Sequence, residues 1–338
     1  MIHILQCKNS TVTDFYLKVI SEMFSISGFH CRFINMADIY NYDRNDLFVV
    51  STDTDFVWLY NKGFKNIVLW VQGIAPEESY LKHKSILRYK ILNSFSKFAI
   101  KHSLGVIYVS EKMKCFIENK FSITTTEKAF IMPCFNDTIE KASFFEPGKY
   151  KHNTFCYVGS LSKWQCFEKT VNYYKKIEGV VENTKLIVYT PEKEKAHSIL
   201  SCANVQNYCV DFVAPSKLNS CLKNVKFGFI LRDDIDVNRV ATPTKISSYL
   251  AAGVIPIYST CLADFEKFSA KMQYVVPVNN VNAISPKLIK LCENDINCND
   301  VYNEYLKVFE TYYSPEYYIK SSVTWTSNIL KHGNFEVN

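Results

Sequence analysis

The chain has 338 residues, which exceeds one typical domain and suits two domains of ordinary size. Its hydrophobic residues (48%) and charged residues (21%) are those of a soluble globular protein with an ample core. The formal net charge is +6, and no apolar run reaches the roughly 18 residues that span a bilayer, which excludes a transmembrane helix.

The start of the chain and its cysteines indicate a compartment. Residues 1–10 lack the basic start and long apolar centre of a signal peptide, so we expect the protein to stay in the cytosol. The 12 cysteines form no C-x-x-C pair, and Cys292 and Cys298 have no histidine at zinc spacing. In a reducing cytosol they are predicted to be small buried hydrophobic residues.

The N-terminal half predicts alternating strands and helices. A first strand is followed by apolar residues at helical spacing, and Gly28 ends that helix. No G-x-G-x-x-G motif follows the first strand, so the main evidence for a dinucleotide-binding dehydrogenase is missing. Strands are expected at residues 2–5, 30–34, 46–52, 66–73, 106–109 and 128–134.

A basic stretch, residues 81–104, interrupts this alternation. It is predicted as one helix or two, with a basic face and an apolar face. One interpretation is a surface that binds anionic membranes, and an equal alternative is a core helix with a solvated basic face. Nucleic acid is a weaker option because no RNA- or DNA-binding motif accompanies the patch. The stretch has no acidic residue, and its cations are Lys82, Lys84, Arg88, Lys90, Lys97 and Lys101.

A polar segment with Pro147 and Gly148 predicts a domain linker that ends near residue 152. We therefore expect an N-terminal domain over residues 1–150. A strand at 155–158, a tight turn at Gly159 and a helix from Trp164 would then open the second domain. The helix after such a turn offers its positive end to a phosphate group.

Residues 227–258 carry the strongest pattern. An apolar run at 227–231 predicts a strand, a charged loop follows, and a helix is expected with Pro243 at its first position and Gly253 just past its end. In a strand-helix-strand unit, ligands bind at the carboxyl ends of the strands, near the helix N-terminus. Because Arg232, Arg239 and Lys245 surround that point, a nucleotide diphosphate is the expected ligand.

Three stretches resemble bacterial group 1 glycosyltransferases of the GT-B fold, the type that builds capsule and O-antigen polysaccharides. NRVATPTKISSYLAAGVIPI (238–257) is similar to the P-x-K-x-x-E-Y-L-A-x-G-x-P-V-I phrase of the family's donor site. FCYVGSLSKWQCFEKTV (155–171) resembles the start of its C-terminal domain, and LWVQGIAPEESYL (69–81) resembles an acceptor-side loop.

The resemblance implies an α/β protein with two Rossmann-like domains and a cleft between them. Residues 1–150 would be the acceptor domain and residues 151–315 the nucleotide-sugar donor domain. Residues 316–338 would form a C-terminal helix that crosses back to the first domain.

The resemblance also implies an activity: a retaining transfer of a sugar from a nucleotide-sugar donor to a growing surface glycan, which can be polyprenyl-linked. Such an enzyme would work at the inner face of the membrane and would need no cofactor beyond the donor substrate. We expect no metal, because protein cations would neutralise the diphosphate. Asp53 and Asp55 have the spacing of a metal site but lie in the first domain, so we interpret them as loop or capping residues.

The site residues follow from the matched motifs. For catalysis the candidates are Arg239, Lys245 and Asp234. In the family a basic residue near the glycine turn often binds the diphosphate, and Lys163 is the substitute here. The donor-binding candidates are Gly159, Ser160, Lys163, Val213, Thr242, Pro243, Thr244, Ser248 and Tyr249, and those on the acceptor side are Gln72, Gly73 and Glu77.

The chain departs from the family at its acidic pair. Many retaining members carry Glu-x7-Glu here, with the second glutamate on the ribose, whereas this chain has Val240 and Ser248. Asp233, Asp234 or Asp236 would have to replace the first glutamate. A catalytically weak homologue that serves as a scaffold or partner of another glycosyltransferase is therefore the main alternative. A nucleotide-sugar epimerase and a general polyanion-binding protein rank lower.

Overall fold

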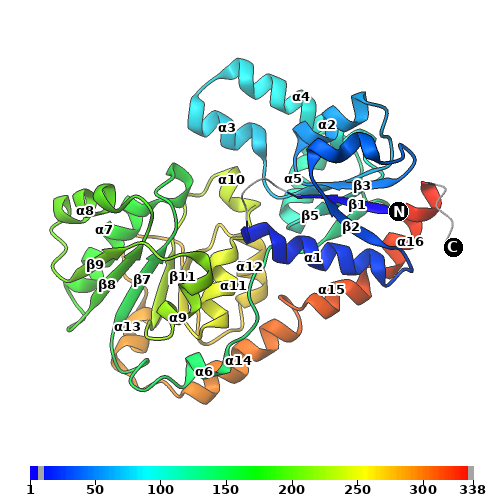
Figure 1. The fold of residues 1–338 in the computed structure, drawn as a ribbon. Helices are drawn as coiled ribbons and strands as arrows, with labels where there is room; N and C mark the ends of the chain where they lie inside the picture. Colours follow the sequence, from blue (N-terminus) through cyan, green and yellow to red (C-terminus); the bar gives the residue numbers. More distant parts are fainter. Residues whose placement is uncertain (7–10, 334–338) are drawn as a thin grey trace. The chain divides into compact units, whose positions relative to one another are not determined.

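The computed structural model describes residues 1–6 and 11–333. The chain divides into two compact units, each built around a six-stranded parallel sheet (Figure 1). Residues 334–338, the end of the segment expected to cross back, lie outside the described residues. Unit 1 comprises Met1–Asn136, Val240–Thr242 and Ser314–Asn338, and unit 2 comprises Asp137–Arg239 and Pro243–Tyr313.

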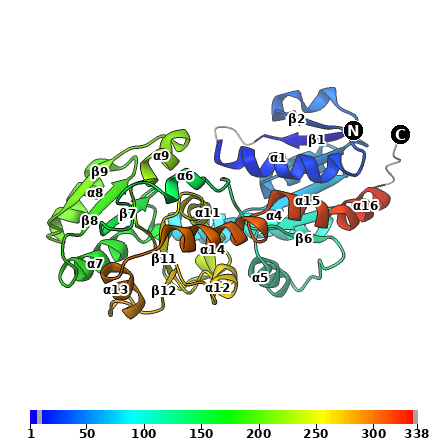
Figure 2. The ribbon, with the colours of Figure 1, turned by 90° about the horizontal axis from the view of Figure 1, so that it is seen from below.

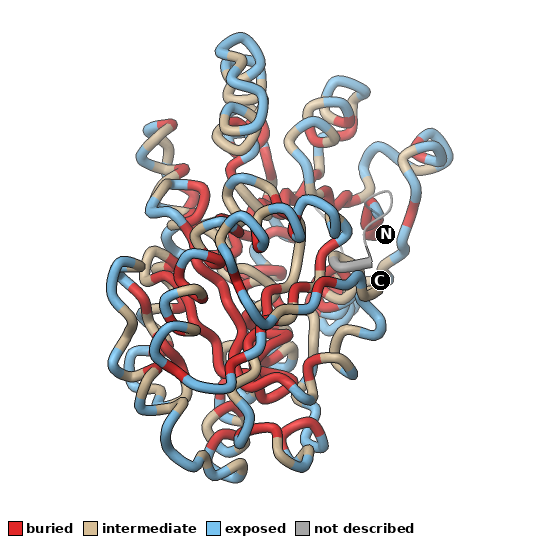
Figure 3. Tube along the Cα trace, turned by 90° about the vertical axis from the view of Figure 1, so that its left-hand side faces the viewer, coloured by how far each residue is buried: buried red, intermediate tan, exposed pale blue. Residues whose placement is uncertain are grey.

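The sheet of unit 1 has the strand order β2-β1-β3-β4-β5-β6, with every neighbouring pair parallel. Most of its strand residues are buried, as expected for a parallel sheet that helices cover on both faces. The same holds for the sheet of unit 2, whose buried strands are red in Figure 3. The strands are β1 (Ile2–Leu5), β2 (Cys31–Ile34), β3 (Leu47–Val50), β4 (Ile67–Val71), β5 (Gly105–Tyr108) and β6 (Ala129–Ile131).

Helices from both ends of the chain complete unit 1. The C-terminal helices lie beside α1 (Figure 2), where the Ser27 and Thr326 hydroxyls are 2.8 Å apart. Trp325 Nε1 donates to the backbone oxygen of Lys128 at 2.9 Å. The helices are α1 (Thr11–Ser25), α2 (Asp53–Asn61), α3 (Ala75–His83), α4 (Ile86–His102), α5 (Glu111–Phe121), α15 (Pro315–Ser321) and α16 (Val323–His332).

The sheet of unit 2 has the order β12-β11-β10-β7-β8-β9, again all parallel. Counted from the first strand of the unit, this is the order 6-5-4-1-2-3 of a dinucleotide-binding fold, whose direction of winding reverses between β7 and β10. The strands are β7 (Thr154–Val158), β8 (Lys185–Tyr189), β9 (Tyr208–Asp211), β10 (Phe227–Ile230), β11 (Ile255–Ser259) and β12 (Val276–Val278).

Unit 2 begins at Asp137, whereas the sequence placed the boundary near residue 150. The amide of Glu140 donates to the oxygen of Ala251 at 2.9 Å, and the Tyr150 hydroxyl donates to the oxygen of Gly253 at 2.8 Å. These bonds involve main-chain atoms, so composition gave no sign of them. The helices of unit 2 are α6 (Lys141–Phe144), α7 (Phe167–Glu178), α8 (Lys193–Cys202), α9 (Leu218–Leu222), α10 (Asp236–Arg239), α11 (Thr244–Ala251), α12 (Ala263–Ser269), α13 (Pro286–Glu293) and α14 (Cys298–Glu310).

The basic stretch 81–104 belongs to two helices, α3 and α4. Lys84 ends α3 in the left-handed conformation (φ 55°), and Ser85 caps α4 by accepting the amide of Arg88. Within the described residues, no helix combines the length and apolar character needed to cross a membrane.

Helix α11 ends as its sequence predicts. Gly253 has φ 71°, its amide donates to Leu250 at 3.1 Å, and the amide of Val254 donates to Tyr249 at 2.8 Å. This pair of bonds is the Schellman motif, which favours glycine at that position. The expected helix start is one residue early, because Pro243 (ψ 122°) holds the N-cap and α11 begins at Thr244.

Candidate functional site

The site in unit 2 lies where the winding of the sheet reverses. Strands β7 and β10 are neighbours, with Phe227 opposite Phe155. Gly159 follows the end of β7, and Arg232 comes two residues after the end of β10. The connections that follow these two parallel strands turn to opposite faces of the sheet and leave a crevice at the carboxyl ends of the strands. Ligands of such sheets bind in that crevice.

Two cations converge on one neutral side chain there. Gln165, at the end of the 3₁₀ turn Lys163–Gln165, accepts hydrogen bonds on Oε1 from Lys245 Nζ at 2.5 Å and from Nη2 of Arg232. Nη1 of Arg232 also donates to the backbone oxygen of Gln165 at 2.6 Å. Among the described residues, neither cation has an ion pair with a carboxylate.

The electrostatics of this pair favour an anion. Burial lowers the pKa of Lys245 well below its usual value, and the charge of Arg232 lowers it further. Burial also lowers the pKa of Arg232, whose side chain is only 6% exposed. An anion next to both groups would favour their charged forms and oppose these shifts.

Gly159 makes room for the ammonium group. Its φ of 129° is unfavourable for other residues, and a Cβ atom would collide with Nζ of Lys245. The sequence predicted that a ligand would approach the backbone at this turn, and in the structure the ammonium group of Lys245 takes that space. Ser160, the next residue, has its Oγ 3.0 Å from Oγ of Ser162.

The first turn of α11 adds backbone donors. No side chain of the described structure caps this helix, because Pro243 holds the N-cap position. Uncapped amides and the helix dipole attract negative charge at a helix N-terminus. Thr244 and Lys245 open the helix, so the amides lie next to the two converging cations.

A carboxylate that the sequence did not single out lies beside Ser248. Oγ of Ser248 donates to Oδ2 of Asp137 at 2.6 Å, and Nδ2 of Asn219 donates to Oδ1 at 3.1 Å. Ser248 occupies the position of the family's second glutamate. Asp137, the first residue of unit 2, therefore places a half-buried carboxylate next to the serine.

The remaining charges of the loop after β10 neutralise one another. Arg239 binds Asp234 through two hydrogen bonds of 2.6 and 3.1 Å, and its Nη1 lies 3.2 Å from Asp236. The bond to Asp234 raises the pKa of Arg239 and lowers that of the aspartate. Asp233 pairs with Lys169, which lowers the pKa of Asp233. The catalytic candidates Arg239 and Asp234 thus bind each other.

Two donor-binding candidates have structural partners of their own. Tyr249 is fully buried, packs on Gly228 and directs its hydroxyl to the oxygen of Phe229, so it is a core residue. Thr242 belongs to unit 1, where its Oγ1 accepts the amide of Cys134 at 3.0 Å.

The other two candidates lie in loops. Lys163 is exposed, and the described structure records no hydrogen bond or ion pair of its side chain. Val213 is half-buried in the loop after β9. Lys163 begins the 3₁₀ turn that ends at Gln165.

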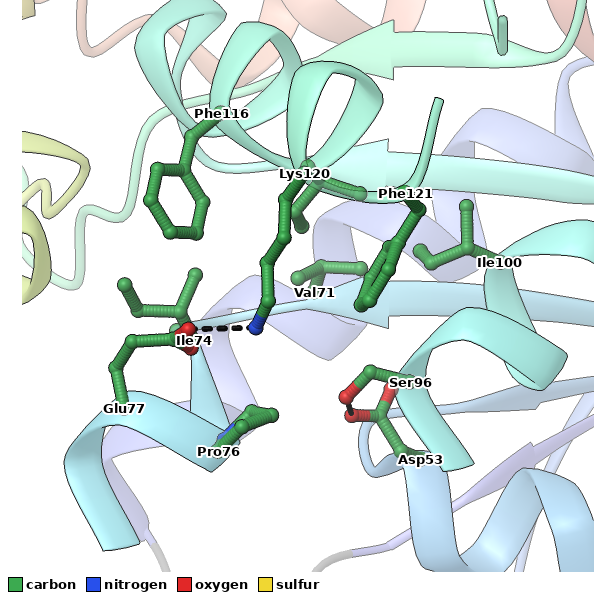
Figure 4. Close-up of a pocket in the computed structure, with 12 residues that line it drawn as sticks. Asp53, Val71, Ile74, Pro76, Glu77, Ser96, Ile100, Phe116, Lys120 and Phe121 are labelled. Atoms are coloured by element: carbon green, nitrogen blue, oxygen red, sulfur yellow. Dashed lines mark hydrogen bonds and ion pairs between the residues drawn. The ribbon is translucent and has the colours of Figure 1, made fainter. Parts of the chain in front are cut away.

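Unit 1 has a small pocket at the acceptor-side candidates (Figure 4). Lys120 from α5 and Glu77 from α3 form an ion pair of 2.5 Å in its wall, and Oε2 of Glu77 is buried without a hydrogen-bond partner in the described structure. Gly73 also lines the pocket, and Gln72 directly follows β4. Apolar side chains, including Phe116 and Phe121, line the rest.

The two aspartates of the D-x-D spacing have different roles. Thr52 caps α2 by accepting the amide of Asp55 at 3.0 Å, and its own hydroxyl donates to Asp55, so Asp55 is part of the cap. Asp53 instead lines the pocket and accepts a hydrogen bond from Ser96. Burial raises the pKa of Asp53. Within the described residues, no cluster of three potential metal ligands occurs.

Comparisons with known proteins identify the fold. No family model matches the chain, and no curated protein matches its sequence. Among solved structures, TarM is 13% identical with a TM-score of 0.65, over 84% of this chain and 55% of TarM. WaaG, a glycosyltransferase involved in lipopolysaccharide biosynthesis, is 11% identical with a TM-score of 0.58, over 99% of this chain and 96% of WaaG.

A third match is an E. coli structure described as trehalose-6-phosphate bound with UDP-2-fluoro glucose. It is 8% identical with a TM-score of 0.66, over 98% of both chains. A TarM mutant from S. aureus was solved with UDP, and the chain spans a little over half (56%) of that protein. These similarities, with the two parallel sheets, show that the chain has the GT-B fold, as predicted.

Sequence reasoning missed three residues of the two sites. Gln165 carries no charge, so nothing in the sequence marked it as the acceptor shared by two cations. Asp137 lay in the expected linker, where a single aspartate is unremarkable. Lys120 lies far from Glu77 in the sequence, so only the fold brings the two together.

Proposed function

We propose that the chain is a glycosyltransferase that binds the diphosphate of a nucleotide sugar between Arg232 and Lys245. The observation that supports this most is that two cations share a neutral acceptor, Gln165, at the reversal point of a dinucleotide-binding sheet. The TarM and E. coli structures contain UDP or a UDP-sugar analogue, so UDP is the first nucleotide to test.

Sugar transfer requires a site that stabilises negative charge on the diphosphate. Transfer breaks the bond between the anomeric carbon and a phosphate oxygen, and the electron pair of that bond stays on the leaving diphosphate. A hydroxyl oxygen of the acceptor forms the new bond to carbon, and the proton of that hydroxyl passes to the leaving diphosphate. Fixed cations and helix amides stabilise the charge that builds on the diphosphate. Lys245, Arg232 and the first turn of α11 would supply this stabilisation without a metal ion.

Asp137 would supply the carboxylate that the sequence motif lacks. A carboxylate can accept hydrogen bonds from both hydroxyls of a ribose, as in dinucleotide-binding folds. Asp137 accepts a hydrogen bond from Ser248, and Ser248 lies one helical turn after the start of α11. We therefore expect Asp137→Asn to weaken binding of a nucleoside diphosphate and to leave binding of inorganic pyrophosphate unchanged.

On the acceptor side we propose a glycan of the capsule or O-antigen type, carried by a membrane lipid at the cytosolic face. The pocket with Glu77 and Lys120 places a carboxylate and an ammonium group beside aromatic rings, a combination that suits sugar hydroxyls and ring faces. Its cavity of about 10 Å³ has room for one water molecule, so a sugar would bind here only after these side chains move apart. Retention of the anomeric configuration follows only from the family resemblance.

A scaffold role is the second candidate, and a specific observation favours it. All three aspartates of the loop after β10 are held in ion pairs, so none is available to replace the family's first glutamate without breaking one. A homologue of this kind would bind nucleotide and transfer no sugar.

Two measurements test the proposal. The first is the melting temperature with UDP, GDP, dTDP and CMP, because a ligand of the folded state raises it. The second is sugar transfer from the matching donors, with and without EDTA, and the anomeric configuration of the product by NMR. Stabilisation with transfer supports an enzyme, and stabilisation without transfer supports the scaffold. No stabilisation by any nucleotide would contradict both.

A further inference from the structure

A groove along one side of α14 (orange in Figure 2) belongs to neither site described above. Its volume is about 620 Å³, within the range of roughly 300 to 1,000 Å³ that is typical of ligand pockets. One wall is formed by residues 268–274, at the end of α12 and in the loop that follows. The other wall is the side of α14 that runs from Asp300 to Thr311. All of these residues belong to unit 2, so that unit alone builds the groove.

Hydrogen bonds to α14 hold the loop wall in place. The carboxylate of Glu304 accepts the amides of Gln273 at 2.6 Å and of Tyr274 at 2.8 Å. The hydroxyl of Tyr305, the next residue of α14, donates to the backbone oxygen of Tyr274 at 2.5 Å. The groove is therefore formed before any ligand arrives, and binding would not require the loop to become ordered.

The polar lining of the groove contains both donors and acceptors of hydrogen bonds. Ammonium groups only donate, carboxylates only accept, and side-chain amides do both. The two ammonium groups and two carboxylates are equal in number, so the groove has little net charge. Within the described residues, Lys271, Lys307 and Asp300 have no ion pair, so their polar groups are available to a ligand. The groups are those of Lys271, Lys307, Asp300, Glu304, Gln273 and Asn303.

Apolar side chains form the rest of the lining. Phe268 is half-buried, and its ring stacks on that of Tyr312 with the centroids 4.4 Å apart and an angle of 23° between the planes. Met272 and Val308 add aliphatic surface. A sugar ring has C–H groups on its faces and hydroxyls around its edge that donate and accept hydrogen bonds. The lining therefore matches both parts of a sugar.

We propose that the groove along α14 binds an oligosaccharide segment of a glycan. The wall from Asp300 to Thr311 is ~16 Å long, since an α-helix rises 1.5 Å per residue, and this length exceeds one sugar ring. A polyanion would meet the two carboxylates of the groove and be repelled by them. A metal ion would lack ligands, because the described residues contain no cluster of three that could hold one.

A groove of this kind would hold part of a growing glycan while its end is elongated at the donor site. Longer acceptors would then bind more tightly than short ones. Only this consequence rests on the proposed function, since glycan binding to the groove requires no sugar transfer.

The test is affinity electrophoresis of the full chain in gels that contain dextran, laminarin, mannan or galactan, with heparin as the polyanion for comparison. We expect at least one neutral polysaccharide to retard the chain, with little dependence on salt. The variant Gln273→Ala, Asn303→Ala should bind about tenfold more weakly, since a neutral hydrogen bond contributes roughly a factor of two to ten. Asn303→Trp places a large ring in the groove and should abolish the retardation.

Matched controls separate the groove from other polar and aromatic surface. Asn279→Ala, Asn282→Ala removes two other exposed amides of unit 2, and Lys195→Trp places the same large ring on α8. Both controls should bind polysaccharide as the wild type does. All variants should be stabilised by UDP to the same extent, which shows that the fold and the nucleotide site are intact.

Three results would overturn the proposal: no retardation of the wild type by any of the four neutral polysaccharides, groove variants that are retarded as strongly as the controls, or retardation that high salt abolishes. In the first case, dimers that disappear in Asn303→Trp would show that the groove binds a second copy of the chain. Because the gels contain no nucleotide, failure of this proposal is distinguishable from failure of the donor site.

Discussion

The loop and helix after β10 contain two groups of charges that look alike in the sequence and differ in the structure. Arg239 lies among aspartates and binds Asp234 and Asp236. Lys245 and Arg232 share only the neutral Gln165. In the first group an exposed cation is paired with carboxylates, whereas the two basic groups of the second are largely shielded from water and have no ion pair with a carboxylate in the described structure.

The two groups differ in how much their charges destabilise the protein when no ligand is bound. An exposed ion pair contributes little and is screened by salt. Burial disfavours the charged forms of Lys245 and Arg232 and lowers both pKa values, and the charge of Arg232 lowers the pKa of Lys245 further. That destabilisation is relieved only when an anion arrives, so the second group is suited to bind one.

The largest effect is expected for Lys245→Ala. Removal of one fixed donor to a developing charge typically lowers kcat about 10²- to 10³-fold, and we expect at least this loss of sugar transfer. Stabilisation by UDP should disappear as well. Lys195→Ala is the control, since this lysine of α8 is exposed and is not a candidate for the site. Equal losses in the two variants would place the diphosphate elsewhere.

Gln165→Glu would give Lys245 and Arg232 a carboxylate partner, as Arg239 has in Asp234. A carboxylate of the same shape would pair with both Lys245 and Arg232, so the melting temperature should rise while stabilisation by UDP falls. Differential scanning fluorimetry measures both effects in one experiment.

Gln165→Leu is the opposite change at the same position. It removes the shared side-chain acceptor, so Lys245 loses this hydrogen bond and Arg232 keeps only its bond to the backbone oxygen of position 165, and the free protein should melt at a lower temperature. The increase caused by UDP should persist. If Gln165→Glu binds UDP as tightly as the wild type, these cations do not form the anion site.

Nucleotide binding should depend on pH. The pKa of Lys245 is lowered in the free protein, and a bound diphosphate would raise it again by favouring the ammonium form. Between the two pKa values, binding takes up a proton, so affinity should fall as pH rises through the pKa of the free protein. Calorimetry in buffers of different ionisation enthalpy measures this uptake. No uptake, or release of a proton, would contradict the assignment.

Sequence patterns predicted the fold well because parallel sheets have strong local signals. Buried strands such as Phe227–Ile230 are short apolar runs, and Gly253 marks a helix end that needs a positive φ. The sequence gave no sign that unit 2 begins at Asp137, because residues 137–150 are attached to it by hydrogen bonds to main-chain oxygens, which composition does not report.

The candidate site was less predictable, for a physical reason. The sequence indicated cations near a helix N-terminus, and Lys245 and Arg232 do meet there. It could not show which cation would be neutralised, since this depends on side chains that only the folded loop brings together. Asp137 and Ser248 lie 111 residues apart, and their hydrogen bond had no local signal.

The smallest effect is expected for Arg239→Gln, although the sequence gave this arginine the same role as Lys245. Asp234 already neutralises its charge, and the side chain is 43% exposed, so transfer should change by less than about fivefold. Asp234→Asn provides the matched test, because it removes the carboxylate that accepts two bonds from the arginine and leaves only the contact with Asp236. Tighter UDP binding in Asp234→Asn would show that Arg239 reaches the diphosphate once released. Suppose that sugar transfer falls as much in Arg239→Gln as in Lys245→Ala. The ion pair of Arg239 would then open when the enzyme binds its substrate, and the contrast between the two groups of charges would hold only for the protein without nucleotide.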